Sequence, residues 1–99
     1  MKSLKEIRKD LSEIRIYYSN IRGKCEGEKI GVNNYVRDLA SKYNIAISKA
    51  PAELYAFYCA MYIEGNTLES LSEKWGYGIQ SMYYRNKKLK AYFQKTILD

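Results

Sequence analysis

The side chains best suited to chemistry gather in one stretch, residues 79–90, which reads IQSMYYRNKKLK. An amide such as that of Gln80 can pair with an adenine edge, and a hydroxyl such as that of Ser81 can bond to bases or phosphate. The lysines suit phosphate oxygens, which give affinity without sequence information. The stretch therefore predicts contact with a nucleic acid. The candidate contact residues are Ile79, Gln80, Ser81, Tyr83, Tyr84, Arg85, Lys87, Lys88 and Lys90.

Net charge is concentrated in the same part of the chain. Residues 1–73 carry 11 basic and 10 acidic side chains, whereas residues 74–99 carry six basic side chains against Asp99 alone. The last quarter therefore supplies +5 of the formal net charge of +6. A one-sided field of this kind favours a polyanion as partner. Charge alone leaves open the alternative of an ordinary solvated helix face.

Residue types typical of catalysis are sparse. The chain has no histidine, which is the commonest general base and metal ligand. Cys25 and Cys59 stand 34 residues apart and fit no metal or redox spacing. We expect both to be free thiols, with a structural disulfide as the alternative. No pair of carboxylates lies in apolar surroundings. The sequence therefore predicts a binding protein, not an enzyme, with no cofactor and no metal.

Two helical patterns must position the candidate residues. The first covers 67–75, with Thr67 as a good N-cap, and the second covers 79–94. Ser72 is small enough to let the two helices cross closely. Gly76 lies where the turn between them needs a positive φ, and we expect Tyr77 to enter the core from this turn. The inward residues are Leu68, Leu71, Trp75, Met82, Leu89 and Phe93.

Two further amphipathic helices precede this unit, over 32–44 and 51–64. Pro51 suits the start of the second one, and Gly65 suits its end. The tyrosines of the second helix could form a base-stacking platform, but their helical spacing beside Leu and Met favours a place in the core. The apolar positions are Val32, Tyr35, Val36, Leu39, Tyr43, Leu54, Phe57, Tyr58, Met61 and Tyr62.

The N-terminal segment carries a stripe with the 3-4 spacing of a coiled-coil seam, on a helix over 3–22. Charged residues, among them Asp10, occupy its other faces. Two interpretations stay open. The stripe pairs with a second copy in a homodimer, or it packs on the chain's own helices. Glycine-containing residues 24–31 then form a linker. The stripe residues are Leu4, Ile7, Leu11, Ile14, Tyr18 and Ile21.

Residues 67–93 resemble the helix-turn-helix of region four of bacterial sigma factors. They are more closely similar to small phage regulators of the RinA and ArpU late-gene activator type. The matching residues are Gly65, Thr67, Leu68, Leu71, Ser72, Trp75, Gly76 and Tyr77. The likeness covers about residues 54–93. It implies transcription control in a phage or prophage, with double-stranded DNA as partner and RNA polymerase as a further one.

Two positions depart from that pattern. Gly78 stands where the family often has a Ser or Thr N-cap, and the change costs about a few tenths of a kcal/mol in cap strength. Arg85 stands where the family usually has an apolar residue, one turn after Met82, and Asn86 shares its face. These residues weaken the expected seal between the two helices.

Together these patterns predict an all-α chain of five helices. Residues 1–31 form an N-terminal heptad helix with its linker, and 32–99 form a helical domain with a helix-turn-helix at 67–93. No segment is apolar enough for a membrane span or a signal peptide, so we expect a cytoplasmic location in the host cell. The leading hypothesis is a dimeric DNA-binding regulator. The second is a protein–protein adaptor or inhibitor on the same fold, docking on a host nucleic-acid enzyme without sequence-specific DNA binding.

Overall fold

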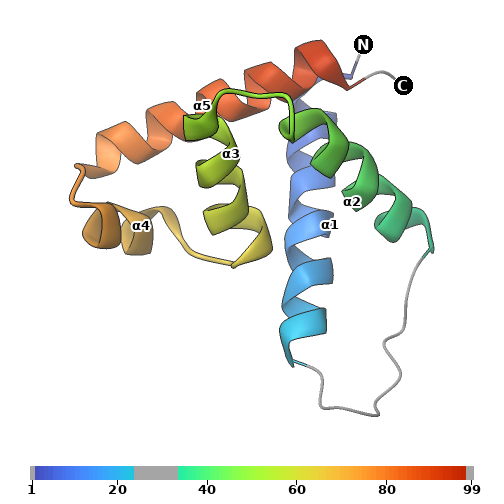
Figure 1. Cartoon of the computed structure of the whole chain (residues 1–99), viewed down its shortest axis with the longest axis horizontal. Coiled ribbons are helices and arrows are strands. Elements are labelled where there is room, and N and C mark those ends of the chain that lie inside the picture. Colours follow the sequence, from blue (N-terminus) through green and yellow to red (C-terminus); the bar gives the residue numbers. More distant parts are fainter. Residues whose placement is uncertain (1, 24–33, 98–99) are drawn as a thin grey trace.

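The computed structural model describes residues 2–23 and 34–97 of the chain (Figure 1). These residues fold into five α-helices and contain no strand. The all-α prediction is confirmed, and helix ends differ from the predicted ones by at most three residues when the π-helical turn after the third helix is counted with it. The predicted linker and Cys25 lie outside the described residues. The elements are α1 (Leu4–Gly23), α2 (Asn34–Ile47), α3 (Ala52–Tyr58), the π-helical turn η1 (Cys59–Ile63), α4 (Leu68–Trp75) and α5 (Ile79–Thr96).

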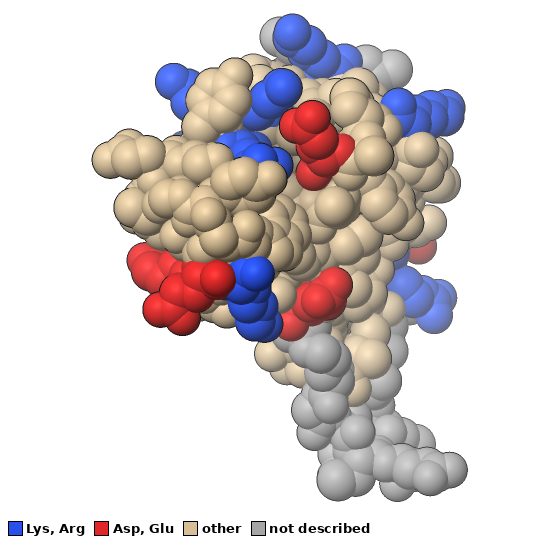
Figure 2. Space-filling model, turned by 60° about the vertical axis from the view of Figure 1, so that its left-hand side comes forward, with Lys and Arg blue, Asp and Glu red and all other residues tan. Residues whose placement is uncertain are grey.

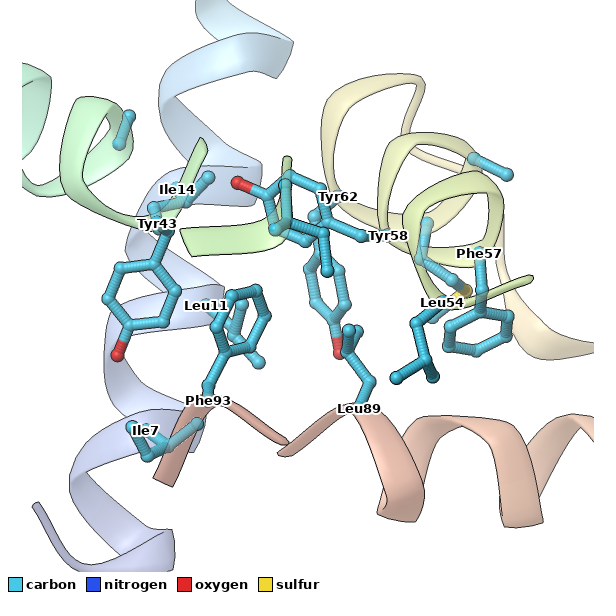
Figure 3. Packing of buried hydrophobic residues seen from close by; sticks show 14 of the residues in the cluster. Ile7, Leu11, Ile14, Tyr43, Leu54, Phe57, Tyr58, Tyr62, Leu89 and Phe93 are labelled. Atoms are coloured by element: carbon cyan, nitrogen blue, oxygen red, sulfur yellow. The ribbon is translucent and has the colours of Figure 1, made fainter. Parts of the chain in front are cut away.

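Helix α5 lies across the ends of the other helices (Figure 1). Helix α4 sits at one end of α5, α1 and α2 sit at the other end, and α3 with η1 lies between them. Phe93 of α5 is fully buried where these elements meet. Its ring centroid is 4.7 Å from that of Tyr43 in α2 and 5.5 Å from that of Tyr58 in α3. One core cluster therefore joins all five helices around α5 (Figure 3).

The apolar stripe of α1 belongs to this core. Ile7, Leu11 and Ile14 are fully buried against the chain's own helices, while Leu4 and Ile21 at its ends stay exposed. Tyr18 is half-buried, and its hydroxyl oxygen accepts a hydrogen bond of 2.8 Å from Asn44. Of the two interpretations of the stripe, packing within the chain therefore describes its middle. A homodimer stays a prediction and needs another surface.

Asp10 departs from its predicted place on a polar face of α1. Its side chain is buried and accepts a hydrogen bond of 2.7 Å from the hydroxyl of Tyr43 in α2. The ammonium of Lys2 pairs with the same carboxylate oxygen. A buried carboxylate needs such partners because desolvation of an unpaired charge is costly. The helix itself begins with a capping box, in which Ser3 and Glu6 bond each other's backbone N–H.

Helix α3 follows Pro51 and continues into η1, a turn with wider hydrogen-bond spacing. Such π-turns leave backbone groups that need new partners. The carbonyl oxygen of Ala60 accepts two hydrogen bonds, one from the backbone N–H and one from the side-chain amide of Asn66. Gly65 then ends the helix with φ 81°, as predicted. None of the described helices combines the length and apolar character that a membrane span needs.

Candidate nucleic-acid interface

Helix α4 is held in place at both ends. At its start, the hydroxyl oxygen of Thr67 accepts a hydrogen bond of 3.0 Å from the backbone N–H of Ser70, which is the predicted N-cap. In its middle, Leu71 is almost fully buried. At its end, the half-buried ring of Trp75 packs edge-on against Phe57 of α3 at a centroid distance of 6.4 Å. The helix is therefore fixed against the core before the chain turns.

The turn from α4 to α5 depends on Gly76 and Ser72. Gly76 has φ 73°, and its backbone N–H donates to the carbonyl of Ser72. The hydroxyl of Ser72 in turn donates to the carbonyl of Tyr77. The positive φ is the conformation that the sequence predicted for Gly76, because glycine adopts it without a Cβ clash. Ser72 closes the turn by a hydrogen bond in addition to being small.

The expectation that Tyr77 enters the core is wrong. Its side chain is 49% exposed. Leu71 and Met82 already fill the space between the two helices, and both are buried. Tyr77 instead lies outside, where the guanidinium carbon of Arg85 sits 4.7 Å from its ring centroid. Arg85 therefore covers an aromatic ring at the surface, which explains how a cation is accommodated where an apolar residue was expected.

Helix α5 divides into an inner and an outer side. Met82, Leu89 and Phe93 are fully buried on the inner side, as predicted. Five of the nine candidate residues are exposed on the opposite side, and we call this set the outer ridge. With 3.6 residues per turn, these positions share one side of the helix. The outer ridge consists of Gln80, Tyr83, Tyr84, Lys87 and Lys88.

The other four candidates lie on the flanks of α5. Ile79 packs against the core on one flank, and Lys90 lies partly buried farther along it. Burial and then the nearby Arg8 of α1 lower the pKa of Lys90 below its ordinary value. On the other flank, Arg85 donates a long hydrogen bond of 3.4 Å from Nε to the hydroxyl of Ser81. The structure therefore brings five candidates together and places four beside them.

Asn86 ties α5 to the turn η1. Its side-chain oxygen accepts a hydrogen bond of 2.7 Å from the hydroxyl of Tyr62, which is itself buried. Burial raises the pKa of Tyr62 to about 12, although Arg15 and the bond to Asn86 act in the opposite direction. Sequence reasoning noticed Asn86 only as a polar residue on the inner flank of α5. Its hydrogen bond could not be predicted, because its partner Tyr62 is far from it in the sequence and buried in η1.

Charges are distributed unevenly around the α4 end of the molecule. Figure 2 shows this face, with mostly basic side chains and one acidic group in its upper part, acidic side chains around a basic one toward its lower edge, and a broad uncharged area between them. The exposed Glu69 and Glu73 outnumber the exposed Lys74 on α4, whereas the outer ridge places Lys87 and Lys88 on α5, with Glu53 of α3 near Lys88. An anionic ligand is therefore attracted to α5 and repelled from the outside of α4.

Other kinds of site find little support within residues 2–23 and 34–97. No cluster of three or more potential metal ligands occurs among them. Cys59 is a free thiol, and burial raises its pKa, so it is a weaker nucleophile than an ordinary cysteine. Comparison with known proteins found no matching family, no matching curated protein and no matching solved structure.

Proposed function

We propose that the chain is a small DNA-binding transcriptional regulator of the phage type, in which α4, the Gly76 turn and α5 act as a helix-turn-helix. In such a motif the second helix enters the major groove, and its early residues contact base edges. Gln80 is the residue suited to read adenine, while Tyr83 and Tyr84 suit thymine methyls or the backbone. Lys87 and Lys88 would bind phosphates farther along the groove.

The observation that carries the proposal is the two-sided character of α5. Its inner side is anchored in the core by Met82, Leu89 and Phe93. Its outer side presents an amide, two phenols and two ammonium groups to solvent, and no acidic residue lies between Ile79 and Thr96. Rigid attachment and uniform charge are both needed for a helix that must hold its register in a groove.

Affinity for random-sequence duplex DNA tests the proposal most directly. Fluorescence anisotropy with a labelled duplex would be measured as the salt concentration is raised from about 50 to 200 mM. We expect the logarithm of affinity to fall linearly with the logarithm of salt, with a slope of about −0.9 per phosphate contacted. Absence of binding at about 50 mM salt would end the proposal. If the chain does bind, selection of bound fragments from a phage or host genome library would identify the operator.

A second candidate function is a protein–protein adaptor or inhibitor on the same fold. The observation in its favour is the row of exposed phenols at the α4 end, because Tyr77, Tyr83 and Tyr84 are each about half exposed or more. Tyrosine is enriched in protein interfaces. If the protein binds purified RNA polymerase but does not bind duplex DNA, this candidate would be favoured over the first.

A further inference from the structure

Residues of α2 and of the second half of α5 line a groove. In Figure 1 these two segments meet at the end of α5 opposite to α4. The groove encloses about 430 Å³. Its apolar part is formed by Ile45, Tyr92 and the buried Ile97, and the hydroxyl of Tyr92 is occupied by a hydrogen bond of 2.8 Å to the carbonyl of Ala46. We call this feature the α2–α5 groove. It lies beside α5 and is separate from the outer ridge.

Ile45 makes this surface unusual for a solvated helix. Its side chain is 61% exposed, although it stands between two hollows. The second hollow, of about 390 Å³, lies between α1 and α2 and includes Tyr17 and Arg37 in its wall. An apolar surface of a partner can pack against such a surface, with the exposed aliphatic side chain between its own side chains and its side chains in the two hollows.

The rim of the α2–α5 groove is positively charged. Lys42 of α2 and Lys49, which lies two residues after the end of α2, are both exposed and line the groove together with Ile45. Among residues 2–23 and 34–97, no carboxylate lines either hollow. Asp38, one turn before Lys42, forms no ion pair with it in the described part of the chain. The groove therefore offers an apolar centre between two unneutralised cations.

We propose that the α2–α5 groove docks an acidic amphipathic helix of a partner protein. An apolar side chain of that helix packs beside Ile45, and carboxylates on its polar face meet Lys42 and Lys49. Nucleic acid fits less well, because an exposed isoleucine and an apolar floor offer nothing to phosphates. This inference is independent of the proposed DNA-binding function, since none of its residues belongs to the outer ridge.

The probe is a labelled amphipathic peptide of about 16 residues, with leucines on one face and glutamates on the other. Two matched peptides replace every glutamate by lysine or scramble the sequence. We expect the acidic peptide to bind at least about tenfold more tightly than both controls. Its amide shift changes in ¹⁵N NMR should centre on residues 42–49, at the end of α2 and in the turn after it, and on α5 from Tyr92 to Thr96. Equal affinity for the three peptides, or shift changes centred elsewhere, would overturn the proposal.

Two variants test the residues themselves. Ile45→Ser and the pair Lys42→Ala with Lys49→Ala should each weaken acidic-peptide binding by about tenfold or more. Ile16→Ser is the matched control for the first, because Ile16 is 60% exposed on the outside of α1. Unchanged peptide affinity in both variants refutes the assignment. A loss of duplex DNA affinity in the lysine pair, with peptide affinity retained, would assign the groove to nucleic acid instead.

Discussion

Replacing Lys87 and Lys88 by alanine isolates the electrostatic part of the proposed DNA contact. Helix α5 supplies about four cations for phosphates, namely Arg85, Lys87, Lys88 and Lys95. Lys90 is left out because it is partly buried near Arg8. Four contacts predict a salt slope of about −3.6. Affinity for random duplex DNA would then fall about 150-fold between 50 and 200 mM salt.

The double variant should have a slope of about −1.8, so that the same change in salt costs it only about 12-fold. Both lysines are exposed, and alanine is at least as good a helix former, so the fold should be unaffected. The control pair is Lys5→Ala with Lys9→Ala, which removes the same charge from the outside of α1. Anisotropy titrations on all three chains give the slopes. If the two double variants change the slope equally, net charge and not the outer ridge governs binding, and the assignment of the ridge fails.

Three further predictions concern stability. Gly76→Ala should cost about 1–2 kcal/mol in the free energy of unfolding, because φ 73° strains any other residue although no atom crowds the position; urea titration that shows no loss would contradict the turn geometry. Gly78→Ser should gain about 0.5–1 kcal/mol in the free energy of unfolding. A few tenths come from the cap, because the φ of −66° and ψ of 155° suit an N-cap and no atom crowds the position, and the rest comes from the smaller conformational freedom of the unfolded chain without this glycine. An unchanged urea midpoint would count against it. The free energy of unfolding should fall from about pH 10 to pH 12, because Tyr62 keeps its proton in the folded chain up to about pH 12 but loses it near pH 10 when unfolded. Tyr62→Phe should reduce the pH dependence of the free energy of unfolding by about 1.4 kcal/mol per pH unit. An equal pH dependence in both chains would rule out the contribution of Tyr62.

Periodicity alone was sufficient for the helices and for the inner side of α5. A stripe such as Met82, Leu89 and Phe93 can be buried only if the backbone is helical, so its spacing predicts both the helix and its orientation. The conformation of Gly76 was equally accessible, because few residues other than glycine tolerate a positive φ. These features depend on local sequence and on burial of one helix face, and both can be read from a single amino-acid sequence.

Features that depend on neighbours could not be predicted in the same way. The stripe of α1 has the same spacing whether Leu11 faces a second copy or the chain's own core, so the sequence left both interpretations open. Tyr77 is apolar enough for the core, but Leu71 and Met82 leave it no space. Asp10 was placed on a polar face and Asn86 was expected only to weaken the seal between two helices, because the buried tyrosine partner of each lies on another helix. The π-turn η1 likewise has no recognised spacing in the sequence.

The two ends of the described chain lie side by side, since the side-chain amide of Gln94 donates to the backbone carbonyl of Lys2 at 3.2 Å (Figure 1). The folded chain has a radius of gyration of 13.9 Å, whereas an unfolded chain of this length has one of about 30 Å. Dyes attached near both ends would therefore exchange energy efficiently only when α1 and α5 are joined through the core. A single end-to-end distance, followed by fluorescence transfer, reports assembly of the whole molecule and leaves the outer ridge unlabelled.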